Sequence, residues 1–175
     1  VTRDIDLIKN YPNPLVSWSM NTLDERFKKD MENTPTIKSR IEAMKQIHDE
    51  GIRTTCFISP IFPGITDVFS IIEEIKDFCD YIWLENLNLR GSFKGTIMNY
   101  IKEKYPALYP LYDEIYNKKN ISYWEMLDKQ VEEYANKNRY MYVIDEEPFL
   151  KNPTGKPIII NYFYHEKIRQ SSKKR

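Results

Sequence analysis

This sequence has few cysteines and histidines, no net charge and no long apolar run, and each of these features argues against a class of protein. Two cysteines among 175 residues do not make the disulfide framework typical of secreted chains, so we expect reduced thiols and a cytoplasmic location. The histidines, His48 and His165, are interpreted as surface residues rather than metal ligands. Because 26 basic and 26 acidic residues cancel, the overall charge favours neither nucleic acid nor membrane.

No apolar stretch is long enough to span a bilayer, and the first residues, Val1 to Asp4, have no signal-peptide pattern. Valine stands first in place of methionine, which favours a piece of a longer chain, with processing of an ordinary start as the alternative. The composition, 41% hydrophobic, suits one buried core, so we expect a single domain over 1–175. Lys167 to Arg175 is locally basic and could contact phosphates, although short charged termini are more often solvated.

Alternating strand and helix patterns organise the first half of the chain. Leu15–Thr22, Ile52–Pro60 and Tyr81–Asn86 have the alternation or β-branched content of strands. A helix with apolar residues at three- and four-residue steps ends at Gly51, and Asp67 can cap a second helix. Such alternation with short connections favours parallel strands joined by helical crossovers.

The second half is less regular. We expect about three helices between Arg90 and Asn138, a fourth strand at Tyr140–Ile144 and an extended segment at Ile158–Tyr164. The predicted fold is therefore α/β, a partial parallel (β/α) barrel of about four strands with a helical insertion and a C-terminal extension. Its parts are barrel strands and helices at 1–90 and 139–147, a helical insertion at 91–138 and an extended tail at 148–175. Open barrel edges favour self-association.

Polar or turn-forming residues follow each of the first three predicted strands. Ligands of parallel α/β folds collect at the carboxyl ends of strands, so these residues are the candidate site. They are Ser17, Ser19 and Asn21 after the first strand, Ser59, Pro60, Pro63 and Gly64 after the second, and Asn86 with Asn88 after the third.

Four segments in their order and spacing resemble the radical S-adenosylmethionine (SAM) superfamily, in particular the branch similar to spore photoproduct lyase. These segments are Thr2–Leu7, the strand that ends Ser19-Met20-Asn21-Thr22, the stretch Ile58–Asp67, and Trp83–Asn88. The resemblance covers residues 1 to about 90 and the strand near Tyr142. It implies the C-terminal half of a radical SAM barrel.

The resemblance also implies roles for the candidate residues. Ser17, Ser19 and Asn21 would hydrogen-bond the ribose or methionine groups of SAM, the turn from Ser59 to Gly64 would lie near adenine, and Asn86 with Asn88 would contact the adenine edge. Hydroxyls and amides suit these tasks because ribose and purine need directed donors and acceptors.

The sequence departs from the family at the iron–sulfur cluster. The family holds a [4Fe–4S] cluster with Cys-x-x-x-Cys-x-x-Cys, whereas Cys56 and Cys79 lie far apart and no third cysteine exists. We therefore expect SAM and the cluster in an intact parent protein, a lyase or a related enzyme, and neither bound by this chain alone. Its partner would be the missing N-terminal half of the barrel. The alternatives are a non-catalytic binding or scaffold half-barrel and a fragment of an ordinary barrel lyase or hydrolase.

Each candidate also has a purely structural interpretation. Ser17 and Ser19 could line a polar barrel interior, and Pro63-Gly64 could be only a turn. Glu85 could be a general base, although an inward carboxylate paired with an arginine is commoner. Both cysteines are interpreted as small core residues.

Overall fold

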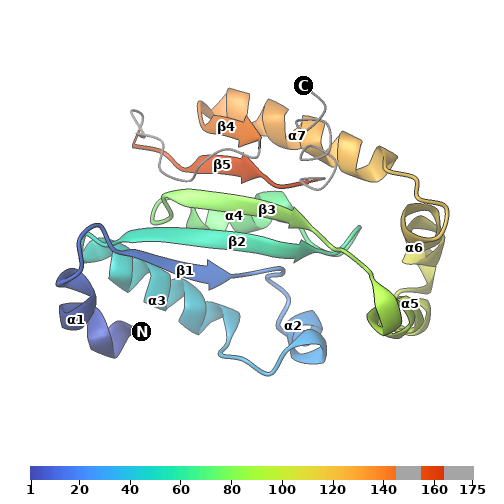
Figure 1. The fold of residues 1–175 in the computed structure, drawn as a ribbon, viewed down its shortest axis with the longest axis horizontal. Helices are drawn as coiled ribbons and strands as arrows, with labels where there is room; N and C mark the ends of the chain where they lie inside the picture. Colours follow the sequence, from blue (N-terminus) through green and yellow to red (C-terminus); the bar gives the residue numbers. More distant parts are fainter. Residues whose placement is uncertain (145–154, 164–175) are drawn as a thin grey trace.

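A five-stranded parallel sheet forms the centre of the molecule in a computed structural model that describes residues 1–144 and 155–163 (Figure 1). The strands lie in the order β1-β2-β3-β5-β4, and every neighbouring pair is parallel. Their bounds are β1 Leu15–Ser19, β2 Arg53–Ile61, β3 Tyr81–Asn86, β4 Met141–Ile144 and β5 Ile158–Asn161. The α/β class with a parallel sheet is thus confirmed, and the arrangement is consistent with a partial (β/α) barrel.

Seven α-helices occur in the described part of the chain. They are α1 Ile5–Lys9, α2 Glu25–Met31, α3 Ile37–Asp49, α4 Val68–Ile75, α5 Gly91–Lys104, α6 Tyr109–Tyr116 and α7 Ser122–Asn138, with short 3₁₀ helices at Thr2–Asp4 and Pro106–Leu108. Two helix starts are capped as their sequences suggest. The Thr36 side chain accepts from the Ser39 amide, and Asp67 accepts from the Ser70 amide.

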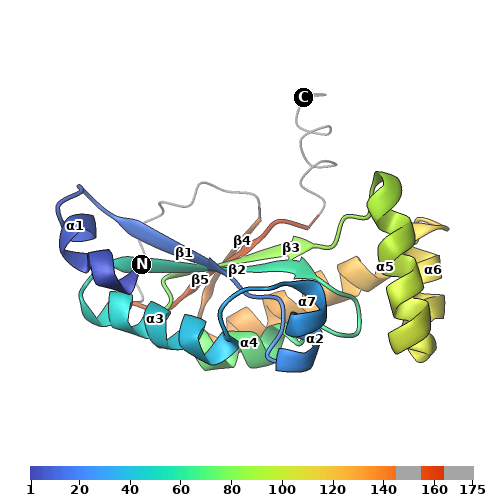
Figure 2. The same ribbon diagram turned by 90° about the horizontal axis from the view of Figure 1, so that it is seen from below.

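The helices cover one face of the sheet. Seen along its edge, α3, α4 and α7 all lie on the same side of the sheet, whereas α1 and α5 lie at its two ends (Figure 2). Helices α5 and α6 lie beyond the carboxyl end of β3 (Figure 1). In a (β/α) barrel the helix-covered side faces outward and the other side faces the barrel interior. We call the side without helices the open face.

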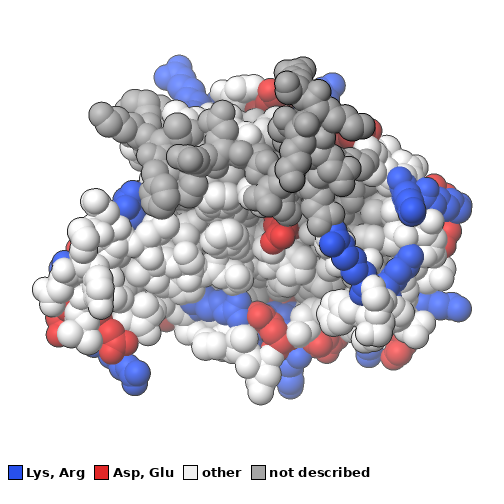
Figure 3. All heavy atoms as spheres, in the orientation of Figure 1, with Lys and Arg blue, Asp and Glu red and all other residues white. Residues whose placement is uncertain are grey.

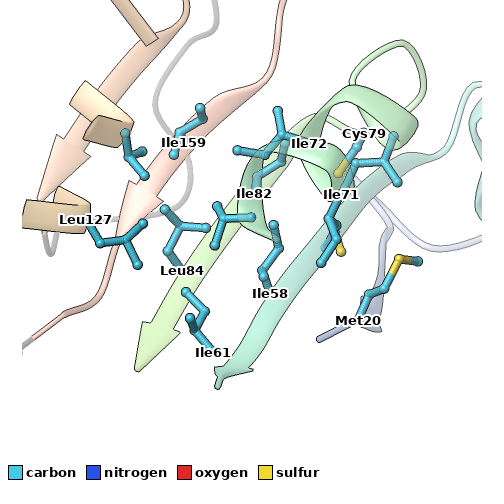
Figure 4. Close-up of a cluster of buried hydrophobic side chains, with 14 of the residues drawn as sticks. Met20, Ile58, Ile61, Ile71, Ile72, Cys79, Ile82, Leu84, Leu127 and Ile159 are labelled. Atoms are coloured by element: carbon cyan, nitrogen blue, oxygen red, sulfur yellow. The ribbon is translucent and has the colours of Figure 1, made fainter. Parts of the chain in front are cut away.

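The main core lies between the sheet and the helices on its covered face. Side chains of Ile58, Ile82 and Leu84 point from the strands toward Ile71 and Ile72 of α4 (Figure 4). All five are fully buried. Burying an aliphatic side chain of this size contributes about 1.5–3 kcal/mol, so this layer supplies much of the stability of the fold.

A second cluster joins the helices beyond the strand ends to the sheet. Phe27 of α2 packs edge-on against Phe62, with ring centroids 5.0 Å apart. Ile97, Ile101 and Tyr112 from α5 and α6 belong to the same buried cluster. The segment between β3 and β4 therefore packs against the carboxyl-end loops, where the candidate residues lie.

The order of the last two strands differs from a simple barrel succession. In a barrel, β4 would lie next to β3, but β5 takes that place and pairs with both strands. The extended segment expected from Ile158 is thus an inner strand of the sheet, and the sheet has five strands rather than about four. The remainder of the expected tail, 148–154 and 164–175, lies outside the described residues, as do His165 and the basic end.

Helix α2 is the element that the sequence pattern did not predict. It has seven residues and only two apolar side chains directed inward, Phe27 and Met31. Asp24 caps it, since its side chain accepts from the amides of Arg26 and Phe27. A helix this short has too few turns for an apolar periodicity to be recognised.

Candidate functional site

The open face of the sheet divides into a side with small hydroxyl residues and a side with aromatic rings. Strand register aligns Ser19 of β1 with Phe57 of β2, Phe57 with Trp83 of β3, and Trp83 with Ile160 of β5. Figure 3 shows that most of the exposed surface between the charged rims is uncharged. The face therefore offers hydroxyl groups at β1 and aromatic rings at β2 and β3, whereas Ile160 is buried.

Ser17 and Ser19 both point away from the core. Both are exposed, and Trp18 between them packs against the main core. They line a cavity of about 470 Å³ together with residues of α3 and the segment before it. In this cavity Arg40 donates to the backbone oxygen of Ser19 at 2.8 Å and pairs with Glu32 at 2.5 Å. The two hydroxyls are thus available beside a fixed guanidinium group.

The backbone of Asn21 connects the end of β1 to the turn after β2. Thr66 donates to the backbone oxygen of Asn21 at 2.7 Å and accepts from the amide of Phe62 at 2.9 Å. Thr66 is buried, so these bonds are shielded from water. They hold two of the predicted segments side by side at the carboxyl edge of the sheet.

Ser59 and Glu85 form a polar pair above the open face. The Ser59 hydroxyl donates to Glu85 Oε2 at 2.7 Å, and the peptide bond between Ser59 and Pro60 is cis. The expectation that an arginine pairs with Glu85 is wrong, because its partner is this hydroxyl and the carboxylate is exposed. β3 directs Glu85 to the same side as Trp83, two residues earlier.

The Pro63-Gly64 turn is engaged by the helices that follow β3. Pro63 is buried. Gly64 has φ +72° and its amide donates to the Tyr123 hydroxyl at 3.1 Å. A Cβ on Gly64 would come within 2.9 Å of a Leu108 methyl group. The turn needs glycine for both its backbone conformation and its close packing.

Asn86 and Asn88 follow β3 at the same edge. Asn86 is half-buried and registers with Ile61 of β2. Asn88 is exposed, and its side-chain oxygen accepts from Arg90 Nε at 3.1 Å. All the predicted residues therefore lie at or near the carboxyl ends of β1, β2 and β3, but Gly64 and Asn88 are already engaged by protein groups.

An aromatic group on the open face was missed by the sequence interpretation. Phe57 and Trp83 stack with centroids 5.4 Å apart and planes 13° from parallel, and Tyr162 meets Trp83 at 5.6 Å in an edge-on arrangement. The alternation of Phe57 with buried Cys56 and Ile58 signals its orientation. Nothing local to Tyr162 indicates its neighbours, since its position depends on the order of the strands.

The cysteines belong to the core and not to the open face. Cys56 and Cys79 are both free and buried, as expected. Burial raises the pKa of the Cys56 thiol to about 12 and raises the pKa of Cys79 well above its usual range. Across residues 1–144 and 155–163 no three His, Cys, Asp or Glu side chains are grouped so that they could hold a metal ion.

Comparison with known proteins gives a match to one family model over part of the chain and two uncharacterized relatives. Residues 1–82 match the family model of the Radical SAM superfamily. Among curated proteins, the uncharacterized protein MJ0683 of Methanocaldococcus jannaschii is 37% identical over 112 residues, which are 63% of this chain and 42% of that protein. The uncharacterized protein ORF301 of Acidianus two-tailed virus is 29% identical over 114 residues, 59% of this chain and 38% of that protein.

The chain thus spans about two fifths of the length of these relatives. No solved structure matches the chain significantly. In the part of the chain that the structure describes, no helix combines the length and the apolar character needed to cross a membrane.

Proposed function

We propose that the chain is part of a radical SAM enzyme and contributes the ribose and adenine side of the SAM pocket. The observation that carries the proposal is the match of residues 1–82 to the Radical SAM superfamily, on a sheet whose open face carries the polar strand ends at one edge. The finer assignment, to the branch similar to spore photoproduct lyase and to a lyase reaction, rests on the sequence resemblance alone.

The chemistry of the open face fits SAM. Ser17 and Ser19 offer hydroxyl groups for ribose or methionine contacts. The apolar surface of Phe57 next to Ser19 suits a purine ring, because aromatic rings stack on one another in offset or edge-on arrangements. Asn86 lies at the carboxyl end of β3, where its amide can hydrogen-bond a purine edge. The proposed pocket includes Ser17, Ser19, Asn21, Ser59, Pro60, Pro63, Gly64, Asn86 and Asn88.

The cysteines of this chain do not fit a [4Fe–4S] cluster. A cluster ligand must be a thiolate, whereas Cys56 and Cys79 are buried among aliphatic side chains with raised pKa values. Intact members of the superfamily use SAM with a cluster, so we propose that another part of the protein holds it. That part would be the N-terminal half of the barrel, which would also pair with the exposed edge of β1.

The chain's own residues would bind and orient the cofactor. SAM bound with such a cluster supplies a 5′-deoxyadenosyl radical in the superfamily. Here Arg40 and Thr66 hold the backbone of β1 and its following turn, which fixes where Ser17, Ser19 and Asn21 stand. The apolar surface of Phe57 on the open face would exclude water from the bound ring. These are positioning roles, and none of them requires a residue of this chain to exchange a proton.

The test is calorimetric titration of the complete gene product with SAM. Ser19→Ala and Asn86→Ala remove groups proposed to contact SAM, and we expect each to weaken binding several-fold, since a hydrogen bond contributes about 0.5–1.5 kcal/mol. Ser122→Ala and Asn99→Ala are matched controls, because both residues are exposed, on α7 and α5, and neither belongs to the proposed pocket. Unchanged affinity in both pocket variants would refute the assignment.

A sequence observation tests the enzyme class separately. A Cys-x-x-x-Cys-x-x-Cys motif encoded upstream of Val1 supports a radical SAM enzyme. An open reading frame that starts at this point contradicts it and leaves a binding or scaffold half-barrel.

A further inference from the structure

A small pocket on the aromatic side of the open face is built from three adjacent strands. Its volume is about 270 Å³, and it is lined by Phe57 of β2, Trp83 and Glu85 of β3, and Tyr162, which follows β5. This volume lies just below the range of about 300–1,000 Å³ typical of sites for whole drug-sized ligands. The pocket therefore suits one group of a larger ligand.

The order of the strands creates this pocket. The Tyr162 amide donates to the backbone oxygen of Leu84 at 2.8 Å, which places Tyr162 alongside Glu85. Had β4 lain next to β3, the tyrosine would stand one strand further away. Three rings and a carboxylate thus come from β2, β3 and the end of β5 to one place.

The electrostatics of the pocket favour a positive guest. The face of an aromatic ring carries negative partial charge and attracts cations, most strongly at tryptophan. Glu85 adds a full negative charge at the same place, and the hydrogen bond from Ser59 fixes its orientation. Among the described residues, no lysine or arginine forms an ion pair with Glu85. A neutral aromatic ligand would stack on these rings but would not be attracted to the carboxylate.

We propose that this pocket binds the ammonium group of an organic substrate, a primary or methylated amine. The designation as a substrate site rests on the proposed function. Ser19 lies two strands from Trp83, about 10 Å at the usual strand spacing. The open face then has room for the cofactor at β1 and the strand ends, and for a substrate group between Phe57, Trp83 and Tyr162.

The test compares two probes of the same shape and different charge. Choline carries a quaternary ammonium group, and 3,3-dimethylbutan-1-ol has a carbon atom in place of its nitrogen. Binding to the complete gene product and its variants is followed by isothermal titration calorimetry. We expect choline to bind at least about tenfold more tightly, because its charge is attracted to the aromatic rings and to the carboxylate.

Variants distinguish the contribution of the Glu85 charge to binding from that of the aromatic rings. Glu85→Gln should reduce the preference for choline severalfold, leaving the part that the aromatic rings contribute, while the neutral probe binds as before. Trp83→Leu should weaken both probes. Glu103→Gln is the control, since this carboxylate is 76% exposed on α5, and it should change neither. Equal binding of the two probes, or no binding of choline, overturns the inference.

A competition with SAM distinguishes this inference from the proposed function, because SAM itself carries cationic groups. Choline binding that SAM leaves unchanged supports a separate substrate site. Displacement of choline by SAM overturns the substrate assignment and supports the SAM pocket. SAM binding without choline binding refutes the inference alone, and choline binding without SAM binding refutes the proposed function alone.

Discussion

The two faces of the sheet carry opposite kinds of side chain, although the same strands supply both. Toward the helices, β2 and β3 present Cys56, Ile58, Ile82 and Leu84, all of which are buried. Toward the open face, the same two strands present aromatic rings, hydroxyl groups and the carboxylate of Glu85. The side chains of the covered face suit a packed core, whereas the open face carries polar and charged groups that would be unfavourable in a core. Changes on the covered face should therefore alter stability, and changes on the open face should alter binding.

The largest expected effect concerns the thiols of the covered face. Because burial raises the pKa of Cys56 to about 12, its thiolate fraction at pH 8 should be about a thousandfold lower in the folded protein than in the unfolded chain. Iodoacetamide labelling followed by mass spectrometry, with and without urea, compares the two states, and the burial of the thiol slows labelling of the folded protein further. Comparable rates in both conditions would show that the thiol is accessible in the folded protein.

A pair of truncations compares the faces directly. Ile82→Ala removes a fully buried side chain and should lower the free energy of unfolding by about 2–5 kcal/mol. Ser19→Ala on the open face should change it by less than about 0.5 kcal/mol. Urea unfolding monitored by circular dichroism measures both. A larger loss from the serine variant would reverse our assignment of the two faces.

One polar group interrupts the covered face and can be tested separately. Buried Asn161 donates to Asp128 and to the Tyr142 hydroxyl and accepts from the Phe163 amide at 2.6 Å. Asn161→Ala leaves the Phe163 amide without its acceptor, while Tyr142 still donates to Asp128, and should cost about 1–3 kcal/mol in unfolding free energy. The exposed Asn136→Ala on α7 is the control, and equal losses would exclude a specific role for this network.

The smallest effect is expected at the cap of α4, and it depends on pH. Hydrogen bonds from Ser70 lower the pKa of Asp67 below its ordinary value, so its charge stabilises the folded state. That stabilisation is complete well above about pH 4, the pKa of the unfolded chain, and is lost as the pH falls through the lower pKa of the folded state. Asp67→Ala should cost about 1 kcal/mol at neutral pH.

Asp67→Ser gives a matched comparison, because serine caps helices without charge. The difference in unfolding free energy between the unsubstituted chain and the Asp67→Ser variant should shrink in acid, as measured by urea unfolding at pH 7 and pH 3. A difference that grows in acid would contradict the lowered pKa.

Local signals in the sequence were sufficient for most elements of the fold. Tyr81–Asn86 is a strand with the predicted bounds, and Gly51 and Asp67 mark helix ends where expected. These features depend on neighbours within a few residues, as alternation, capping and glycine conformation all do. The polar ends of β1, β2 and β3 also lie at one edge, because parallel strands with helical crossovers require it.

The rest depended on contacts that the sequence does not encode locally. The place of β5 between β3 and β4 follows from packing of the whole sheet, and Tyr162 meets Trp83 only for that reason. Likewise, Ser59 lies opposite Glu85 through the register of β2 with β3, which no single-strand pattern reveals. The engagement of Gly64 by Leu108 and Tyr123 depends on how the helices after β3 return to the strand ends.

The inner position of β5 sets the order in which this sheet can be completed during synthesis. β4 pairs with β5, the strand made after it, and β3 is joined to β4 only through β5. Because synthesis proceeds at about 5–20 residues per second, Met141–Ile144 is made on the order of a second before its partner strand. A nascent chain that stops before Ile158 therefore exposes the unpaired edges of both β3 and β4 to chaperones and proteases.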